Sequence, residues 1–282
     1  MRAIESQKPE AERICFDAYA RPLVNILMNK VAVTLSSWII SSSIYSRLAP
    51  GAVEFIIARE RYIDDTLKTY LDEGLDQVVI LGAGFDTRAY RIPGIEKTHV
   101  FEIDHPATQA VKLEKLKQVI HPLPANVTFL PVDFDTQTLS ERLLSSGYNE
   151  QGKTLFIWQG VTYFLTSQGV DNTLAFIANH SGVGSAVIFD YFYNETLRDT
   201  KHGYGKAMRR AARLSGEDYM FGIDKGHIES FLTRRGFGDV HNMELPALKP
   251  LYFKGKNANR VLPTGIAIVS ARVNKTGAAQ TT

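Results

Sequence analysis

The chain has few of the features that mark secreted or membrane-spanning proteins. It contains a single cysteine, Cys15, so no disulfide can form within it, and this usage is typical of a reducing compartment. The most hydrophobic early stretch, residues 31–40, is too short to cross a bilayer, which needs about 20 apolar residues. Residues 1–13 are polar and lack the apolar centre of a signal peptide. We therefore expect a cytoplasmic protein with no membrane partner.

Neither sign of charge is in excess. The 32 basic and 30 acidic residues leave a net charge of +2, which gives no electrostatic reason to expect a nucleic-acid partner. The histidines at positions 202, 227 and 241 show no metal-ligand spacing, so we assign no metal. A hydrophobic content of 44% in 282 residues suits a globular chain that forms one large domain. We assign no oligomeric state.

The hydrophobic pattern changes at about residue 76. Before it, residues 1–75 are expected to form a helical cap, with helical spacing from Ile14 to Leu27 and a clearer apolar stripe from Val53 to Leu71. After it, short apolar runs alternate with helical stretches near 105–120, 136–146 and 167–180. The runs expected as strands are 77–82, 98–104, 126–133, 154–160 and 185–192. Strands that are apolar on both faces and separated by helices predict a parallel sheet covered on both sides.

The C-terminal part departs from this alternation. Residues 194–225 are polar and glycine-containing, which predicts a lid inserted into the domain formed by residues 76–273. A helix at 225–237 and two more strands, at 238–245 and 265–273, are expected to follow it. The tail, residues 274–282, is expected to be disordered.

A tight turn follows the first predicted strand. Gly82 and Gly84 permit backbone conformations closed to other residues and leave room for a ligand against the backbone. The helix expected from Thr87 presents free amide groups at the same place. A dinucleotide site would have a third glycine, whereas here Asp86 adds negative charge. The stretch therefore favours a ligand with a positive group, such as S-adenosylmethionine, over a pyrophosphate.

Acidic residues end the next two strands. Glu102 and Asp104 lie about 20 residues after the glycines, where an acid binds ribose hydroxyls, and either could do so. Asp133 and Phe134 end the third strand, where they would offer an acceptor to the adenine amino group and a flat apolar neighbour. Acidic strand ends in succession behind the glycine turn favour a nucleoside-containing cofactor.

These motifs together resemble a known family. The stretches "VVILGAGFDTRAYR", "FEIDHPATQAVKLEKL", "PVDFD" and "FIWQGVTYFL" are similar to the leucine carboxyl methyltransferase family, and most similar to its microbial and fungal branch of S-adenosylmethionine-dependent O-methyltransferases. The likeness runs from about residue 10 to residue 273. It implies a class I, Rossmann-like α/β fold: a seven-stranded, mostly parallel sheet whose last strand is antiparallel, with additional N-terminal helices.

The resemblance also implies roles for individual residues. Arg59 matches an arginine that pairs with the carboxylate of the cofactor's methionine part, and Gly82 matches the glycine beneath that part. Asp104 matches the ribose-binding acid. The adenine-binding pair and the tyrosine near the methyl-transfer centre correspond to Asp133 with Phe134 and to Tyr163.

One position departs from the family pattern. The family has a glutamate after the fourth strand, and this chain has Gln159 in "WQG". A glutamine keeps one carbonyl acceptor for the cofactor ammonium but loses the charge. We expect Asp86 to compensate in part, because the turn places it near the same group.

Two arginines beside the turn have a simpler interpretation. Arg88 and Arg91 are expected to form ion pairs that pack the strand ends, rather than to act in catalysis. The basic run at 206–214 is expected to be a solvated helix face.

The sequence thus predicts methyl transfer from S-adenosylmethionine to a carboxylate or hydroxyl of a small molecule, with secondary metabolites as candidate acceptors. A hydroxyl acceptor would need a base, for which Tyr163, Asp190 and His202 are the candidates. Alternatives are a protein C-terminal carboxyl methyltransferase, a cofactor-binding protein that transfers no methyl, and a dinucleotide oxidoreductase.

Overall fold

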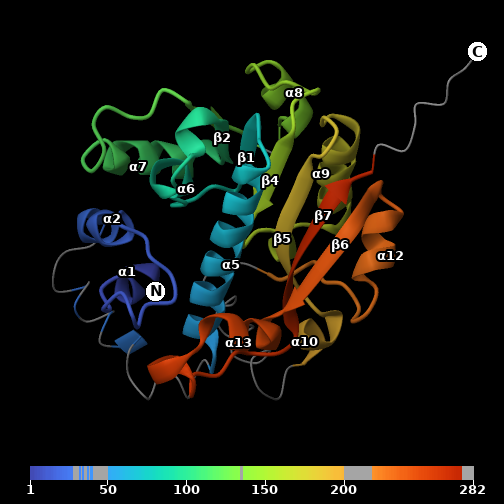
Figure 1. Ribbon diagram of the computed structural model, residues 1–282. Coiled ribbons are helices and arrows are strands. Elements are labelled where there is room, and N and C mark those ends of the chain that lie inside the picture. Colours follow the sequence, from blue (N-terminus) through green and yellow to red (C-terminus); the bar gives the residue numbers. More distant parts are fainter. Residues whose placement is uncertain are drawn as a thin grey trace, which may run out of the picture.

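A seven-stranded sheet forms the centre of the molecule (Figure 1). The computed structural model describes residues 1–27, 32, 34, 37, 39–40, 50–133, 136–199 and 218–274. The strand order is β3-β2-β1-β4-β5-β7-β6. The strands are β1 (Gln77–Leu81), β2 (His99–Asp104), β3 (Val127–Pro131), β4 (Thr154–Trp158), β5 (Ala186–Phe192), β6 (Phe237–Glu244) and β7 (Ile266–Val273).

The pairing follows from the apolar character of the central strands. Every residue of β1, β4 and β5 is buried, so these strands must be covered on both faces. β1 pairs in parallel with β2 and β4, and β4 pairs in parallel with β5. β7 runs antiparallel to both β5 and β6. The predicted seven-stranded sheet with an antiparallel last strand is therefore confirmed.

Two hydrophobic cores lie on the two faces of the sheet, because alternate strand residues point to opposite sides. Val78 and Ile80 of β1 belong to the core that contains helix α5 (Ala52–Asp72). Val79 and Leu81 belong to the other core. The helices that cover this second face are α8 (Leu139–Leu144), α9 (Ser167–Asn179) and α12 (Ile228–Thr233).

Helix α5 is the predicted amphipathic helix, and it crosses the central strands in Figure 1. It begins after Gly51, whose φ of 77° is in the left-handed region that favours glycine. Ile57, Ile63 and Leu67 are fully buried against the sheet. Arg59 and Glu60 lie in the same helix and are also buried. The helix therefore places two charged side chains beside the sheet.

The N-terminal region differs from its prediction. Helical spacing predicted a helix that includes Ile14 and Ala18, but residues 13–19 are not helical and α2 (Ala20–Leu27) begins later. The reason is local, because the Asp17 carboxylate accepts hydrogen bonds from the backbone N–H groups of Tyr19 and Ala20, as a helix-capping residue does. The other α-helices of the described residues are α1 (Arg2–Glu5), α6 (Arg88–Arg91), α7 (Pro106–Leu116), α10 (Asn194–Arg198) and α13 (Lys249–Tyr252).

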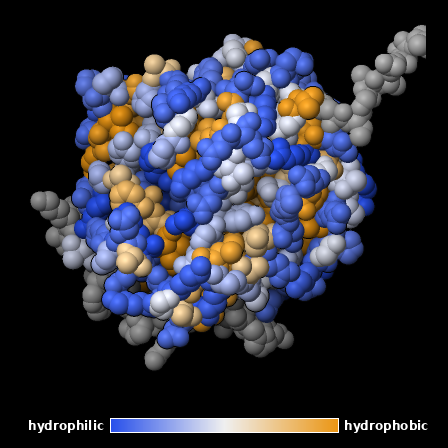
Figure 2. All heavy atoms as spheres, viewed as in Figure 1, coloured by the Kyte–Doolittle hydropathy of each residue, from blue (hydrophilic) through white to orange (hydrophobic). Residues whose placement is uncertain are grey.

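Several predicted features lie partly or wholly outside the described residues. They are residues 200–217 of the expected lid, which include His202 and the basic run at 206–214, and residues 275–282 of the expected tail. Within the part of the chain that the structure describes, no helix is both long and apolar enough to span a membrane. The face seen in Figure 2 is mostly hydrophilic, with apolar residues in several separate groups.

Helix α5 allows a direct test of this packing. Leu67→Ala removes a fully buried side chain and should lower the free energy of unfolding by about 2–5 kcal/mol, measured by chemical denaturation. The neighbouring Lys68→Ala is the control, because the Lys68 side chain is 47% exposed and should change the value by less than about 0.5 kcal/mol. Equal losses for the two variants would contradict the assigned face of the helix.

Candidate functional site

The turn after β1 brings the backbone close to the segment after β4. Gly82 has φ 64° and Gly84 has φ 45°, both in the left-handed region. A Cβ atom on Gly82 would overlap the Cγ2 atom of Val161. The N–H of Gly84 donates a short hydrogen bond to the carboxylate of Asp104, at the end of β2. The glycines thus allow the ends of three adjacent strands to converge.

A pocket of about 280 Å³ lies at this convergence. It is walled by the end of β1, by residues 82–86, by α5 and by the residues that follow β4. Six of the predicted site residues line it, namely Arg59, Gly82, Gly84, Asp86, Gln159 and Tyr163. Arg2 also lines it, which the sequence did not predict. The carboxyl ends of parallel strands are where this class of sheet binds ligands.

Arg59 is held at the wall of the pocket by three neighbours. Its Nη1 atom lies 2.6 Å from the Asp190 carboxylate and 3.5 Å from the Tyr163 hydroxyl, and its guanidinium lies 4.6 Å from the centre of the Phe55 ring. Burial alone would lower the pKa of Arg59, but Asp190 raises it, so the guanidinium is charged. Among the described residues, its Nε atom has no hydrogen-bond partner.

Asp190 and Tyr163 are both buried in this arrangement. One Asp190 oxygen accepts from Arg59 and the other accepts from the N–H of Gly160 at 2.6 Å, so both oxygens are occupied. Burial raises the pKa of the Tyr163 hydroxyl, which favours its protonated form at neutral pH. Asp190 does not line the pocket, whereas Tyr163 does.

Gln159 is oriented by a buried carboxylate. Its amide Nε2 donates to an oxygen of Glu60 at 3.1 Å. Its carbonyl oxygen, Oε1, is buried and has no hydrogen-bond partner in the described part of the chain. Both residues line the pocket. The wall of one pocket therefore contains a residue with an unused donor, Arg59, and a residue with an unused acceptor, Gln159.

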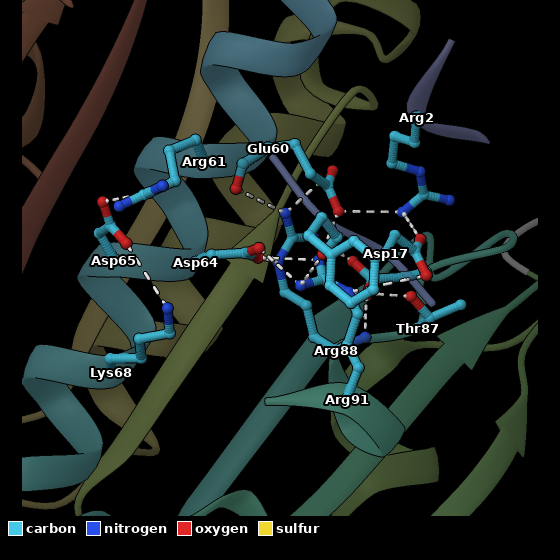
Figure 3. A network of polar contacts seen from close by, with 12 residues as sticks. Arg2, Asp17, Glu60, Arg61, Asp64, Asp65, Lys68, Thr87, Arg88 and Arg91 are labelled. Carbon is cyan, nitrogen blue, oxygen red and sulfur yellow. Dashed lines mark hydrogen bonds and ion pairs between the residues drawn. The ribbon is translucent and has the colours of Figure 1, made fainter. Parts of the chain in front are cut away.

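Glu60 is also the centre of a buried network of charges (Figure 3). Its carboxylate forms ion pairs with Arg2, Arg88 and Arg91, at 3.0, 3.0 and 2.6 Å. Burial alone would raise the pKa of Glu60, but the three guanidiniums and the Gln159 amide lower it well below its usual value. Glu60 is therefore ionised at neutral pH.

Arg88 and Arg91 of α6 extend the network to a second acidic residue of α5. Both guanidiniums contact Asp64, Arg88 at 2.7 Å and Arg91 at 2.6 Å. The Asp86 carboxylate accepts from the backbone N–H of Arg88 at 2.7 Å and forms a short ion pair with its guanidinium. The prediction that Arg88 and Arg91 form ion pairs is confirmed.

Asp86 was expected to compensate in part for the charge that is lost at position 159, but in this network Arg88 competes with the cofactor ammonium for the Asp86 carboxylate. Arg88 occupies both oxygens of the Asp86 carboxylate, and the side chain is 8% exposed. Burial opposes the ionisation of Asp86, but Arg88 lowers its pKa. The carboxylate that contacts Gln159 is that of Glu60. The sequence signal that could have identified Glu60 is its position, because it is an acidic residue within the apolar stripe of a helix.

The two acidic residues of β2 have different surroundings. Glu102 is fully buried and contacts the Lys112 ammonium at 2.6 Å and the Tyr90 hydroxyl at 2.5 Å. Burial raises the pKa of Glu102, and it does not line the pocket. Asp104 is half-buried at the end of the strand, and it accepts from the N–H groups of Gly84 and His105.

The two residues predicted to contact the adenine, Asp133 and Phe134, follow β3 in the sequence. Asp133 is half-buried two residues after the strand, and its backbone N–H donates to the Gln137 side chain at 3.2 Å. Phe134 lies outside the described residues. Within the described residues, no group of three or more His, Cys, Asp or Glu side chains could hold a metal ion.

The sheet order and a pocket at the carboxyl ends of β1 and β4 define the class I methyltransferase fold. A structure from Thermobifida fusca YX, provisionally described as a methyltransferase, matches this fold with a TM-score of 0.58, 13% sequence identity, and coverage of 90% of this chain and 94% of that one. The DszA carbon methyltransferase matches with a TM-score of 0.54 and 10% identity over 89% of this chain and 60% of that one.

Sequence comparison then identifies the family. The profile described as leucine carboxyl methyltransferase matches residues 1–178, so the chain belongs to this family. A Bacillus subtilis (strain 168) protein provisionally named as the S-adenosyl-L-methionine-dependent methyltransferase YktD is 34% identical, over 72% of this chain and 67% of that protein. A similarly named protein of Mycolicibacterium gilvum is 27% identical, over 67% and 62%.

These matches span about two thirds of the length of the two relatives. The predicted enzyme class and cofactor are confirmed at the level of the family, which is that of S-adenosylmethionine-dependent methyltransferases.

The buried network allows a test with a defined pH dependence. Arg88→Met removes the guanidinium that contacts Glu60, Asp64 and Asp86 together and should lower the free energy of unfolding by about 3–5 kcal/mol at pH 7. Arg88 lowers the folded-state pKa of Glu60 and Asp86, so its contribution is present above their unfolded pKa of about 4 and is lost as the pH falls through the lowered values. The difference from the parent protein should therefore shrink toward pH 3.

Arg61→Met is the matched control. Arg61 lies in α5 and pairs with Asp65 at 2.8 Å, but its side chain is 43% exposed. Its loss should reduce stability by less than about 1 kcal/mol, with little pH dependence. A loss for Arg88→Met that stays constant from pH 7 to pH 3 would mean that the carboxylates do not depend on Arg88.

Proposed function

We propose that the pocket binds the methionine part of S-adenosylmethionine, and that the protein transfers the methyl group to a carboxylate of a small molecule. The observation that carries the first part is the pair of unused polar atoms within the described residues. The Nε donor of Arg59 suits a carboxylate, and the Oε1 acceptor of Gln159 suits an ammonium. Both residues line one pocket of about 280 Å³, as the two charged ends of an amino acid require.

The neighbouring strand ends suit the rest of the cofactor. Asp104, half-buried beyond the pocket, would accept from the ribose hydroxyls, and it fits this role better than the fully buried Glu102. Asp133 and Phe134, after the next strand, would contact the adenine. Gly82 and Gly84 would lie beneath the methionine part, where a side chain would block the approach.

A carboxylate acceptor is supported by the state of the acidic groups near the pocket. Of the described residues that line it, Glu60 and Asp86 are held ionised by arginines and are therefore weak bases. The Asp190 oxygens are occupied by Arg59 and Gly160, and the pKa of Tyr163 is raised. A hydroxyl acceptor must lose a proton, whereas a carboxylate is ionised already.

The reaction then needs mainly alignment. An acceptor oxygen donates a lone pair to the methyl carbon while the carbon–sulfur bond breaks, and the electron pair of that bond stays on sulfur as a neutral thioether. Tyr163, next to Arg59, would help to position the sulfonium end and to exclude water. Asp190 would act through Arg59, by holding its guanidinium in place.

The family description supports a second candidate, methylation of the C-terminal carboxylate of a protein. Both candidates use the same cofactor contacts and an ionised acceptor. They differ in whether the acceptor is a metabolite or a polypeptide, so the acceptor supplied in the assay separates them.

The ribose contact can be tested with ligands of different length. Asp104→Ala should weaken the binding of S-adenosylhomocysteine and of 5′-methylthioadenosine by about 1–3 kcal/mol each, because both retain the ribose. Glu114→Ala, which removes an exposed carboxylate on α7, is the control and should change neither value. Isothermal titration gives the dissociation constants. Unchanged binding of both ligands to Asp104→Ala would remove Asp104 from the site.

The acceptor class can be tested with labelled methyl groups. Purified protein with methyl-labelled S-adenosylmethionine should transfer label to small carboxylic acids, and the product should release volatile methanol in base, as methyl esters do and methyl ethers do not. The rate should change little between pH 6 and pH 8, because a carboxylate is ionised throughout this range.

Three results would change the assignment. Base-stable label would indicate a hydroxyl acceptor. Transfer to a peptide with a C-terminal leucine, but to no small acid, would favour the protein-directed alternative. Cofactor binding without release of S-adenosylhomocysteine would indicate a protein that transfers no methyl.

A further inference from the structure

We propose that Glu60 is a positioning residue that makes the pocket selective for the ammonium group of the cofactor, by fixing which end of the Gln159 amide faces the ligand. This inference rests on the proposed function. The family pattern has a glutamate where this chain has Gln159. We assign the negative charge that this glutamate would supply to Glu60, a residue of helix α5.

The orientation of the Gln159 amide follows from hydrogen-bonding chemistry. An ionised carboxylate can only accept, so the group that faces Glu60 must be the NH₂ of the amide. This donor lies 3.1 Å from the Glu60 oxygen. The carbonyl oxygen must then point away from Glu60, and it is the atom left without a partner among the described residues.

The ionisation of Glu60 is enforced by its other contacts. Three guanidiniums lie within 3.0 Å of its oxygens, and the side chain is fully buried. If Glu60 were neutral, its hydroxyl could donate to the amide oxygen, and the amide could turn its NH₂ toward the ligand. The arginines remove this possibility, so the pocket presents an acceptor at this point and not a donor.

The same geometry predicts what a glutamate at position 159 would do. A second carboxylate about 3 Å from Glu60 would repel it, so one of the two groups would have to take up a proton. The protonated form would resemble glutamine, because it can donate to Glu60 and keep a carbonyl for the ligand. A glutamine beside an ionised Glu60 gives this arrangement without requiring a proton.

The test compares ligands that differ only at the amino-acid end. S-adenosylhomocysteine carries the ammonium, an analogue with a hydroxyl in its place does not, and 5′-methylthioadenosine lacks the whole amino-acid part. Glu60→Gln should weaken S-adenosylhomocysteine binding by about tenfold. The hydroxyl analogue should lose less, since a hydroxyl can also accept, and 5′-methylthioadenosine should bind as to the parent protein.

Glu60→Gln removes a charge from three arginines, so a second variant guards against loss of folding. Gln159→Glu keeps the Glu60 network, and its binding of S-adenosylhomocysteine should become pH-dependent and accompanied by proton release, because the ligand ammonium favours the ionised form of both carboxylates. The exchange variant Glu60→Gln/Gln159→Glu should lose this pH dependence, because a single carboxylate remains. A purely structural role for Glu60 would produce neither the ligand selectivity nor the change in pH profile.

The outcomes separate the two proposals. Failure of the parent protein to bind S-adenosylhomocysteine would overturn the proposed function. Parent binding together with an equal loss of all three ligands in Glu60→Gln, or with no loss, would overturn the role of Glu60 alone. So would a pH-independent gain of affinity in Gln159→Glu, since the two side chains would then not be coupled.

Discussion

The buried carboxylate of Glu60 is the contact on which the organisation of the site depends. Its oxygens are shared by Arg2 at the start of the chain and by Arg88 and Arg91 of α6, and they also accept from the amide of Gln159 after β4. One side chain of α5 thus joins the N-terminal segment, the helix after the glycine turn and the end of a central strand. Arg2, α5 and the residues after β4 line the pocket, and α6 directly follows the glycine turn that forms another of its walls.

A network of this kind is weak evidence for stability. Removing charges from water is costly, and a well-packed apolar group of similar volume often stabilises a fold as much as a buried ion pair does. Its value here is geometric, because each guanidinium has several acceptors at fixed positions. Arg88 contacts Glu60, Asp64 and Asp86, so the turn after β1 and helix α5 are held in one relative arrangement. Such an arrangement keeps the pocket in shape before a ligand arrives.

The fold could be predicted because its signals are local. The apolar runs at 77–82 and 154–160 correspond to β1 and β4, and the stripe from Val53 to Leu71 corresponds to α5. The observed ends of these two strands and of this helix differ from the predicted ends by no more than a few residues. The N-terminal prediction was wrong at residues 13–19 because helical spacing alone does not reveal that Asp17 caps the following helix.

The sequence by itself determined the sheet and the family, since the glycine turn, the acidic strand ends and their spacing are all contained in the chain order. It also placed Arg59, Gly82 and Gln159 among the site residues, and these line the pocket. Only the tertiary structure distinguished the surroundings of Glu102 from those of Asp104, because the burial of Glu102 beneath Lys112 and Tyr90 depends on helix packing. It alone brought Arg2 and Glu60 to the pocket, from positions 58 residues apart. The physical reason is that a buried charge is defined by its partners, and those partners meet only when distant segments pack together.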